Sequence, residues 1–244
     1  MSQLELALEA DISARHLSFV ETGRAQPSRD MIVHLAETLA VPLRERNAIL
    51  LAAGFAPVYS ERSLDDPALS AARAAVEAVL QGCAPFPALA VDRRWNIVSF
   101  NAGAGALMTG IAPELLAAPN AMRLALHPNA LAGQIDNFGE WRAHLLARVR
   151  QQIEASGDAG LEELLNELLG YVYPETIDLT PHEHDASGDP AIVVPLRLRF
   201  GDARLSFIST ITVFGTPVDV TLSELAIETF FPADAATSDF LRGK

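Results

Sequence analysis

The stretch 17-LSFVETGRAQPS-28, taken with 2-SQLELALEADISARH-16 before it, decides how the chain begins its fold. Apolar residues recur at helical spacing in both pieces, and Gly23 ends the second run. The pattern predicts two short helices, over residues 2–10 and 13–21, joined by a tight turn. A pair with this connection has the spacing of a helix-turn-helix, whose second helix lies in the major groove of DNA.

Two further helices are predicted over residues 28–41 and 43–54, because apolar residues recur every three to four positions on either side of Pro42. The next residues contain two prolines and lack clean periodicity, which is typical of a linker. We therefore expect a helix-turn-helix domain over 1–55, a linker over 56–67 and a second domain over 68–244.

The second domain mixes helices with short strands that alternate and are rich in β-branched and aromatic residues. Five strands with helices between them predict an α+β domain with an antiparallel sheet flanked by helices. The run 103-GAGAL-107 predicts a helix of small residues packed tightly on that sheet. Other helices are expected over 68–82, 138–155 and 160–171, and strands over 86–92, 95–100, 192–200, 204–214 and 222–231.

Charge is distributed unevenly along the 244 residues, whose formal net charge is −13. Residues 1–62 hold 6 Arg against 8 acidic residues, and the remainder holds 12 basic against 23 acidic residues. An acidic body argues against nonspecific wrapping of nucleic acid, but it leaves room for a small reading domain with a basic face.

Several other functions find little support. The single cysteine, Cys83, excludes an internal disulfide, and no apolar run is long enough to span a membrane, so we expect a cytoplasmic protein. The tetrad His182–Asp185 lies on a polar loop without distant partners, which is a weak metal-site pattern. Neither a G-x-S-x-G elbow nor a G-x-x-x-x-G-K phosphate loop occurs. We expect no catalytic residues, no metal and no enzyme activity.

The residues of the second helix suit DNA recognition. Arg15 can bond guanine bidentately, Phe19 can pack on a thymine methyl, and Arg24 can contact a phosphate. The residues alone leave an alternative open, in which a generic helical hairpin has a merely solvated polar face.

The string SQxELAxEAxIS…HLSxVExGRxxPSRxMIxxLAxxLxVP resembles the XRE, or Cro/C1-type, helix-turn-helix regulators of bacteria across residues 2–42. The Ser-Gln start, the Val-Glu-x-Gly helix end and the Pro-Ser entry to the next helix are all in register. The resemblance implies DNA contacts by Gln3, Ser13, Ala14, Arg15, His16, Phe19 and Arg24.

The chain departs from that family at its start. Family members have a further helix before the Ser-Gln, whereas Met1 directly precedes Ser2 here. We therefore expect an N-terminally incomplete domain that begins at an internal methionine of a longer protein. Apolar area is then expected to be uncovered at Leu4, Ala7, Leu35 and Leu39.

Residues 84–244 resemble the MmyB-like regulator ligand-binding domain, in PALAVDRRWNIVSFNAGAGALMTGIAPELL, LALHPNALAGQIDNFGEWRAHLLARVRQQIEASGD and the late strands through ELAIETFFPADAATSDFLR. The resemblance implies a PAS-like sheet flanked by helices, with an elongated apolar pocket for a fatty acid or a similar lipid-like molecule. Candidates for the carboxylate head are Arg123, His127, Arg142 and His144. The predicted ligand-binding residues are Trp95, Phe100, Leu107, Met108, Phe138, Trp141, Arg142, Leu145, Leu164, Leu168, Leu196, Phe207 and Ile211.

These observations predict a ligand-responsive bacterial transcriptional regulator. Its expected partners are double-stranded operator DNA, an apolar small molecule such as a bound fatty acid, and a second copy in a homodimer, with no membrane partner. Two alternatives stay open: a lipid-binding module that does not bind DNA in this truncated form, and an enzyme that acts on an acyl ligand.

Overall fold

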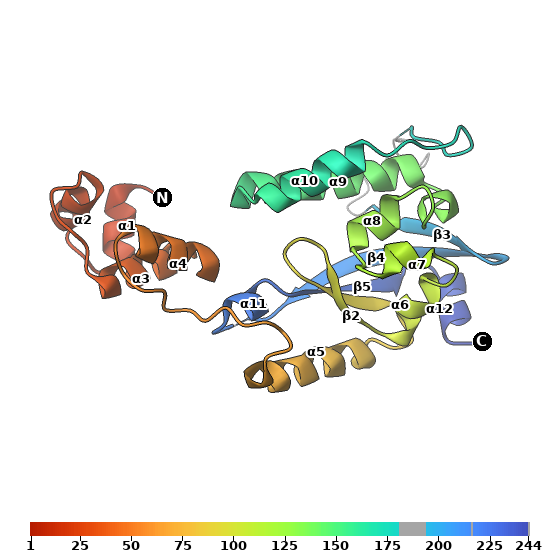
Figure 1. Ribbon diagram of the computed structural model, residues 1–244, viewed down its shortest axis with the longest axis horizontal. Coiled ribbons are helices and arrows are strands. Elements are labelled where there is room, and N and C mark those ends of the chain that lie inside the picture. The colour runs from red at the N-terminus through yellow and green to blue at the C-terminus, as the bar shows by residue number, and fades with distance from the viewer. Residues whose placement is uncertain (181–193, 216, 244) are drawn as a thin grey trace. The chain divides into compact units, whose positions relative to one another are not determined.

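The computed structural model describes residues 1–180, 194–215 and 217–243. The chain divides into two units (Figure 1). The first unit holds Met1–Leu69 together with Phe214–Glu224, and the second holds Ser70–Val213 and Leu225–Lys244. The segment 214–224 thus folds with the first unit, although its sequence neighbours belong to the second.

Four helices form the start of the first unit, as the sequence predicts. Serine side chains cap the first three, because each accepts a hydrogen bond from a backbone N–H of the first turn. Ser2 and Glu5 also form a capping box at the start of the first helix. The helices are α1 (Gln3–Glu9), α2 (Ala14–Glu21), α3 (Arg29–Thr38) and α4 (Leu43–Ala52).

Small residues hold the first two helices together. Ala7 and Ala10 are buried with Leu17, whereas Leu4 is 61 % exposed. Leu4 is thus uncovered, as expected, and Ala7 lies on the inward face of α1. Leu39 is also exposed, as expected, but the expected exposure of Ala7 is wrong.

A five-stranded antiparallel sheet forms the centre of the second unit, in the order β2-β1-β5-β4-β3. This confirms the predicted α+β class; the PAS-like comparison stays a prediction. The last strand begins at residue 226 rather than 222, because Asp219 caps a short helix, α11 (Val220–Ser223). The strands are β1 (Ala88–Val91), β2 (Ile97–Phe100), β3 (Leu196–Phe200), β4 (Ala203–Val213) and β5 (Ala226–Pro232).

Helices lie on both sides of this sheet (Figure 1). The main hydrophobic core includes Leu89 of β1 and Leu198 of β3 with residues of three helices on one side. These are α8 (Ala121–Leu126), α9 (Phe138–Ser156) and α10 (Ala159–Leu169). On the other side lies α5 (Ser70–Gly82). The remaining helices are α6 (Ala102–Leu107), α7 (Pro113–Leu116), α12 (Ala235–Leu241) and 3-10 turns at Pro67–Leu69 and Ala132–Gln134.

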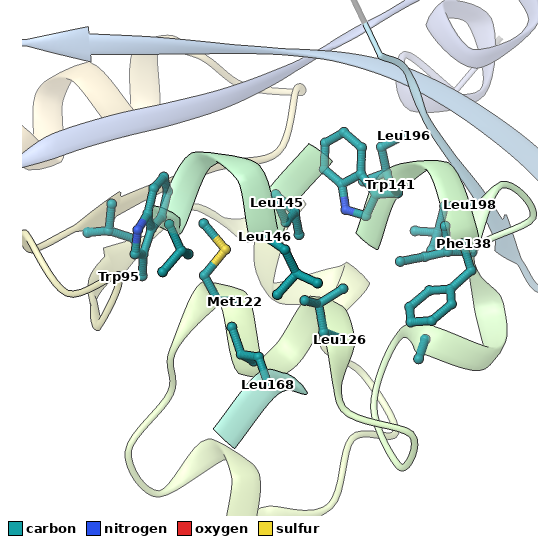
Figure 2. Close-up of a cluster of buried hydrophobic side chains, with 14 of the residues drawn as sticks. Trp95, Met122, Leu126, Phe138, Trp141, Leu145, Leu146, Leu168, Leu196 and Leu198 are labelled. Carbon is teal, nitrogen blue, oxygen red and sulfur yellow. The ribbon is translucent and has the colours of Figure 1, made fainter. Parts of the chain in front are cut away.

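The turn between β1 and β2 directs a tryptophan into the core. The Asp92 carboxylate accepts hydrogen bonds from the backbone N–H groups of Arg94 at 2.8 Å and Asn96 at 2.9 Å. Trp95 takes a left-handed conformation, with φ of 67°, and its ring is buried. Its indole N–H donates to Gln152 at 2.6 Å. Figure 2 shows Trp95 at one end of the core cluster and Phe138 at the other.

Tight packing of α6 requires a glycine. A Cβ at Gly103 would lie 3.0 Å from the carbonyl oxygen of Pro85 and 3.1 Å from the backbone nitrogen of Pro87. These neighbours are backbone atoms, so they cannot rotate away as a side chain can. The close approach fits the helix of small residues that the sequence predicts.

We expect Gly103→Ala to be less stable than Gly82→Ala by about 1–3 kcal/mol, the usual range for overpacking. Both changes place alanine in a helix, but a Cβ at Gly82 meets nothing within 4 Å. Urea unfolding of the two variants measures the difference. Equal stability would contradict the packing described for α6.

Asp158 joins the start of α10 to the β1–β2 turn. Its carboxylate accepts from the backbone N–H of Gly160 at 2.8 Å and from Arg94 Nε at 3.0 Å, and Arg93 Nη1 lies 2.9 Å away. Burial acts to raise the pKa of Asp158, but the hydrogen bonds from Arg94 and Gly160 and the arginine charges outweigh it. The net pKa lies below the ordinary value of 3.8.

Above about pH 5, Asp158→Asn is therefore expected to lower the free energy of unfolding by its full amount. The difference from the wild type should shrink as the pH falls from 3.8 through the lower pKa of the folded carboxyl, because the wild type then loses the same charge. Denaturant unfolding at several pH values measures it, with the exposed Asp239→Asn as control. A difference that is constant down to pH 2 would rule out this role of the charge.

Candidate functional site

The second helix, α2, presents the predicted DNA-reading residues. Ser13 caps the helix by accepting from the backbone N–H of His16 at 3.1 Å. Arg15 is exposed, and its guanidinium lies 5.3 Å from the centre of the Phe19 ring. His16 and Phe19 are half-buried, and Leu17 faces inward. The helix therefore has one face in the core and one face with an exposed cation.

The two predicted backbone-contacting residues lie on either side of this helix in the sequence. The Gln3 side chain, at the start of α1, donates a hydrogen bond to the Glu21 carboxylate at the end of α2. Arg24 is exposed in the turn after α2. Ala14 is half-buried in the first turn of α2. All seven predicted residues belong to the first unit, and their contacts with DNA stay a prediction.

An apolar cavity of about 70 Å³ lies within the second unit. Its lining comes from the sheet and from the α6, α8 and α9 helices. Of 18 lining residues, only Trp141 and Glu228 have a strong hydrogen-bonding group in the side chain. The lining residues are Pro87, Leu89, Ile97, Ala104, Leu107, Met108, Ala121, Met122, Leu124, Ala125, Leu131, Ile135, Trp141, Leu145, Leu196, Leu198, Glu228 and Phe230.

The structure brings five of the predicted ligand-binding residues to this cavity: Leu107, Met108, Trp141, Leu145 and Leu196. Five others are buried outside its lining, namely Trp95, Phe138, Leu164, Leu168 and Phe207. Phe100 and Ile211 are exposed on their strands, and Arg142 is half-buried on α9. The part that each of them takes in ligand binding stays a prediction.

Sequence reasoning missed Glu228, which lies in the middle of β5 and is only 4 % exposed. Its Oε1 atom accepts from Arg148 Nη1 of α9 at 2.9 Å. The Arg148 guanidinium lies 4.5 Å from the centre of the Trp95 ring. A signal was present in the sequence, because Glu228 interrupts a run of apolar and aromatic residues in a predicted strand.

Trp141 supplies the other polar group of the cavity. The residue is 2 % exposed, and its Nε1 has no hydrogen-bond partner among the residues that the structure describes. An unpaired buried donor costs about 1–3 kcal/mol. Figure 2 shows the indole beside Leu196 of β3, and Leu145 lies one turn further along α9.

None of the four candidate cations for a carboxylate head lines the cavity. Arg123 forms a bidentate pair with Glu167, whose hydrogen bonds raise the pKa of Arg123. Arg142 lies over the ring of Tyr173. His127 packs edge-on against Tyr171, and His144 stacks on Trp141.

The His144 imidazole is uncharged at neutral pH. Burial lowers its pKa below the ordinary 6.5, and the positive charge of Arg148 lowers it further. The ring centre of His144 lies 5.4 Å from that of Trp141, so a neutral imidazole covers the indole.

The segment 214–224 is anchored within the first unit by backbone and charge contacts. Val220 is fully buried and donates its N–H to the carbonyl oxygen of Ser60 at 2.8 Å. The Asp219 carboxylate lies 3.2 Å from Arg62 Nη1. Thr221 donates its hydroxyl to the carbonyl oxygen of Arg62 at 2.6 Å.

Arg44 of α4 forms the largest charge contact of this segment. Its Nε and Nη2 atoms bond the two oxygens of Glu224 at 2.6 and 3.0 Å. Its Nη1 and Nη2 atoms bond the two oxygens of Glu61 at 2.9 and 2.5 Å. Hydrogen bonds to Glu224, and next to Glu61, raise the pKa of Arg44, so this guanidinium is held between two carboxylates.

In the described part of the chain, we also searched for a metal site and for a membrane-spanning helix. No group of three His, Cys, Asp or Glu side chains there could hold a metal ion. The tetrad at 182–185 lies outside the described residues. Cys83 is half-buried after α5, with its Sγ atom 3.5 Å from the Thr229 hydroxyl. Within the ranges described, every helix is too short or too polar to cross a bilayer.

Comparison with known families gives one match for each of the two units. A family model described as Helix-turn-helix matches residues 1–46, which confirms the XRE-type resemblance of the first unit. A model described as MmyB-like transcription regulator ligand binding domain matches residues 72–243. No curated protein matches the chain. Together the two matches support a ligand-responsive, DNA-binding transcription regulator, and the chain belongs to the family of the MmyB-like transcription regulator ligand binding domain.

Proposed function

We propose that this protein is a bacterial transcription regulator whose affinity for operator DNA changes when a fatty-acid-like molecule occupies the cavity of the second unit. It acts in the cytoplasm as a homodimer on two related half-sites and performs no catalysis. The observation that most favours this function is the path of β5. The strand lines the cavity at Glu228 and Phe230, and it follows directly from the anchored segment 214–224.

The DNA-reading part of the proposal rests on α2. An exposed arginine near the start of a recognition helix can reach a guanine edge, whereas Arg24 in the following turn suits a phosphate. One helix-turn-helix reads only a few base pairs, so two copies related by a two-fold axis give the usual length of an operator.

The ligand part rests on the cavity. Its lining is apolar except for Trp141 and Glu228, as is typical of sites for apolar small molecules. A volume of about 70 Å³ holds only part of an acyl chain, since benzene already occupies a core cavity of roughly 150 Å³. We expect the cavity to widen on binding, because Met108 and Met122 line it and methionine side chains repack easily.

The coupling part rests on chain connectivity. Strand β4 ends at Val213, β5 begins at Ala226, and the two strands pair, so a ligand that displaces β5 acts on the segment that joins them. Glu224 lies two residues before β5 and holds Arg44 of α4. A ligand changes DNA affinity only if it binds the two arrangements of this segment differently.

Arg15→Ala should weaken binding to the preferred DNA sequence by about 1–3 kcal/mol, roughly 5- to 150-fold, and relax the preference at one base pair. Arg24→Ala should weaken binding to all sequences. The slope of log affinity against log salt concentration should fall by about the contribution of one phosphate contact. Selection of bound sequences from random duplexes, followed by fluorescence anisotropy, measures both. Arg150→Ala, a loss of an exposed arginine on α9, is the charge control. If the protein binds no DNA at any salt concentration, the proposed regulator function is wrong and the alternative of a small-molecule-binding module remains.

Glu224→Gln should uncouple the ligand from the DNA. Native mass spectrometry of the purified protein first identifies the small apolar molecule that it retains. In the wild type this molecule should change DNA affinity about 5- to 150-fold, the usual range of allosteric coupling. In the variant that factor should fall toward one while ligand affinity stays unchanged. Glu167→Gln, which breaks another bidentate arginine pair, is the matched control. If the ligand changes the DNA affinity of Glu224→Gln by the same factor as in the wild type, coupling through Glu224 and Arg44 is excluded.

A further inference from the structure

We propose that the ligand enters the cavity between α6 and α8, and that residues 105–118 form a flap which opens to admit it. The flap comprises the last turn of α6, the short helix α7 and the turns on either side of α7. It carries Leu107 and Met108, which line the cavity. The inference rests on the proposed function, because it describes how the molecule that the second unit senses reaches its site.

Exposure of the cavity lining is greatest on the side of α6 and α8. The lining residues of α9 and β3 are buried, as is Glu228 of β5. Of the seven half-buried lining residues in the described chain, five lie on α6, on α8 or in the turn after α8. These five are Leu107, Met108, Ala121, Ala125 and Leu131, and the other two are Ile97 and Phe230. Solvent therefore lies closest to the cavity at these two helices.

The two sides of this entrance differ in the size of their side chains. Ala121 and Ala125 are one turn apart on α8, so both methyl groups lie on the face that lines the cavity. Leu107 and Met108 supply the larger side chains from the α6 side. The entrance therefore widens most when the α6 side moves, and the side chain of Met108 repacks easily.

Two buried asparagines fix the chain on either side of the flap. Asn101 caps α6 and also accepts a hydrogen bond from the backbone N–H of Ala88 in β1 at 3.0 Å. Asn120 caps α8 and donates to the carbonyl oxygen of Arg94 at 2.8 Å. Neither asparagine is more than 2 % exposed. Displacement of the chain between them is therefore confined to the flap.

Within the flap the backbone is held only by local hydrogen bonds. The N–H groups of Met108, Thr109 and Ile111 donate to carbonyl oxygens three residues earlier. Among the described residues, no hydrogen bond joins 105–118 to a residue outside 101–118. Ile111 is the one buried side chain of 105–118, all of which is described, and it lies outside the main hydrophobic core. A segment with so few tertiary contacts opens locally at a low free energy.

Gly110 sets the closed conformation of the flap. Its φ of 86° lies in the left-handed region, which an alanine adopts only with strain. A Cβ there would meet nothing within 4 Å, so alanine adds strain without a clash. Gly157, at the end of α9, has φ of 62° and equally open surroundings. Alanine at either position has a similar local cost, but only Gly110 belongs to the flap.

The test compares Gly110→Ala with Gly157→Ala in the full chain, with decanoate as the probe. Stopped-flow tryptophan fluorescence follows association, because Trp141 lines the cavity, and mixing with excess cyclodextrin follows dissociation. In Gly110→Ala both rate constants should rise roughly 5- to 30-fold, since left-handed strain disfavours the closed flap by about 1–2 kcal/mol. The dissociation constant should stay within about twofold, because the closed flap is strained with and without ligand. Gly157→Ala should have the rate constants of the wild type.

Hydrogen exchange of the free protein gives a second measurement that needs no ligand. The amides of Met108, Thr109 and Ile111 should exchange at least about tenfold faster than those of Leu124 and His127 at α8. All five donate to backbone carbonyl oxygens, so the comparison is between bonded amides. Decanoate should slow exchange at the three flap amides, because it packs against the closed flap.

The outcomes separate this inference from the proposed function. Rate constants in Gly110→Ala that match those of Gly157→Ala would overturn the flap, as would flap amides that are as protected as Leu124 and His127. If Gly110→Ala does not fold, the exchange comparison in the wild type decides. If decanoate does not bind, the fatty-acid-like ligand class of the proposed function is wrong, and exchange in the free protein still tests the flap.

Discussion

The bidentate pairing of Arg44 with Glu224 fixes a segment that interrupts the sheet-forming sequence between β4 and β5. The same arginine holds Glu61, so the linker and the segment 214–224 share one cation on α4. Val220, which is buried, adds a backbone hydrogen bond to Ser60. Strand β5 continues from this anchor and also lines the cavity, so our proposal makes the ligand act on the anchor through this strand.

The helices and strands could be predicted well because their signals are local. Ser2, Ser13 and Ser28 cap helices that begin where the sequence predicts them, and the strands expected over 86–92 and 95–100 pair as β1 and β2. The start of β5 was predicted four residues too early, since Asp219 caps a helical turn in a stretch that alternates like a strand. Ala7 was expected to be uncovered, but it lies on the inward face of α1 and is buried.

The candidate site was only partly predictable, because it depends on contacts between distant residues. Leu107 and Leu196 could be expected near a pocket from their apolar character, but so could Leu164 and Phe207, which fill the core elsewhere. Residue type alone does not separate a cavity lining from a closed core. Glu228 acquires its role from Arg148, 80 positions away, and the anchor of 214–224 joins residues up to 180 positions apart. No local pattern contains those pairings.

Hydrogen exchange at the Val220 amide tests the central claim most directly, because that N–H donates to Ser60 at the anchor and lies outside the cavity lining. The measurement compares the protein before and after an apolar ligand fills the cavity. Our account predicts that ligand binding changes the protection of Val220 and its neighbours in the described part of 214–224, together with DNA affinity. Unchanged exchange in this segment, with DNA affinity altered by the ligand, would contradict it.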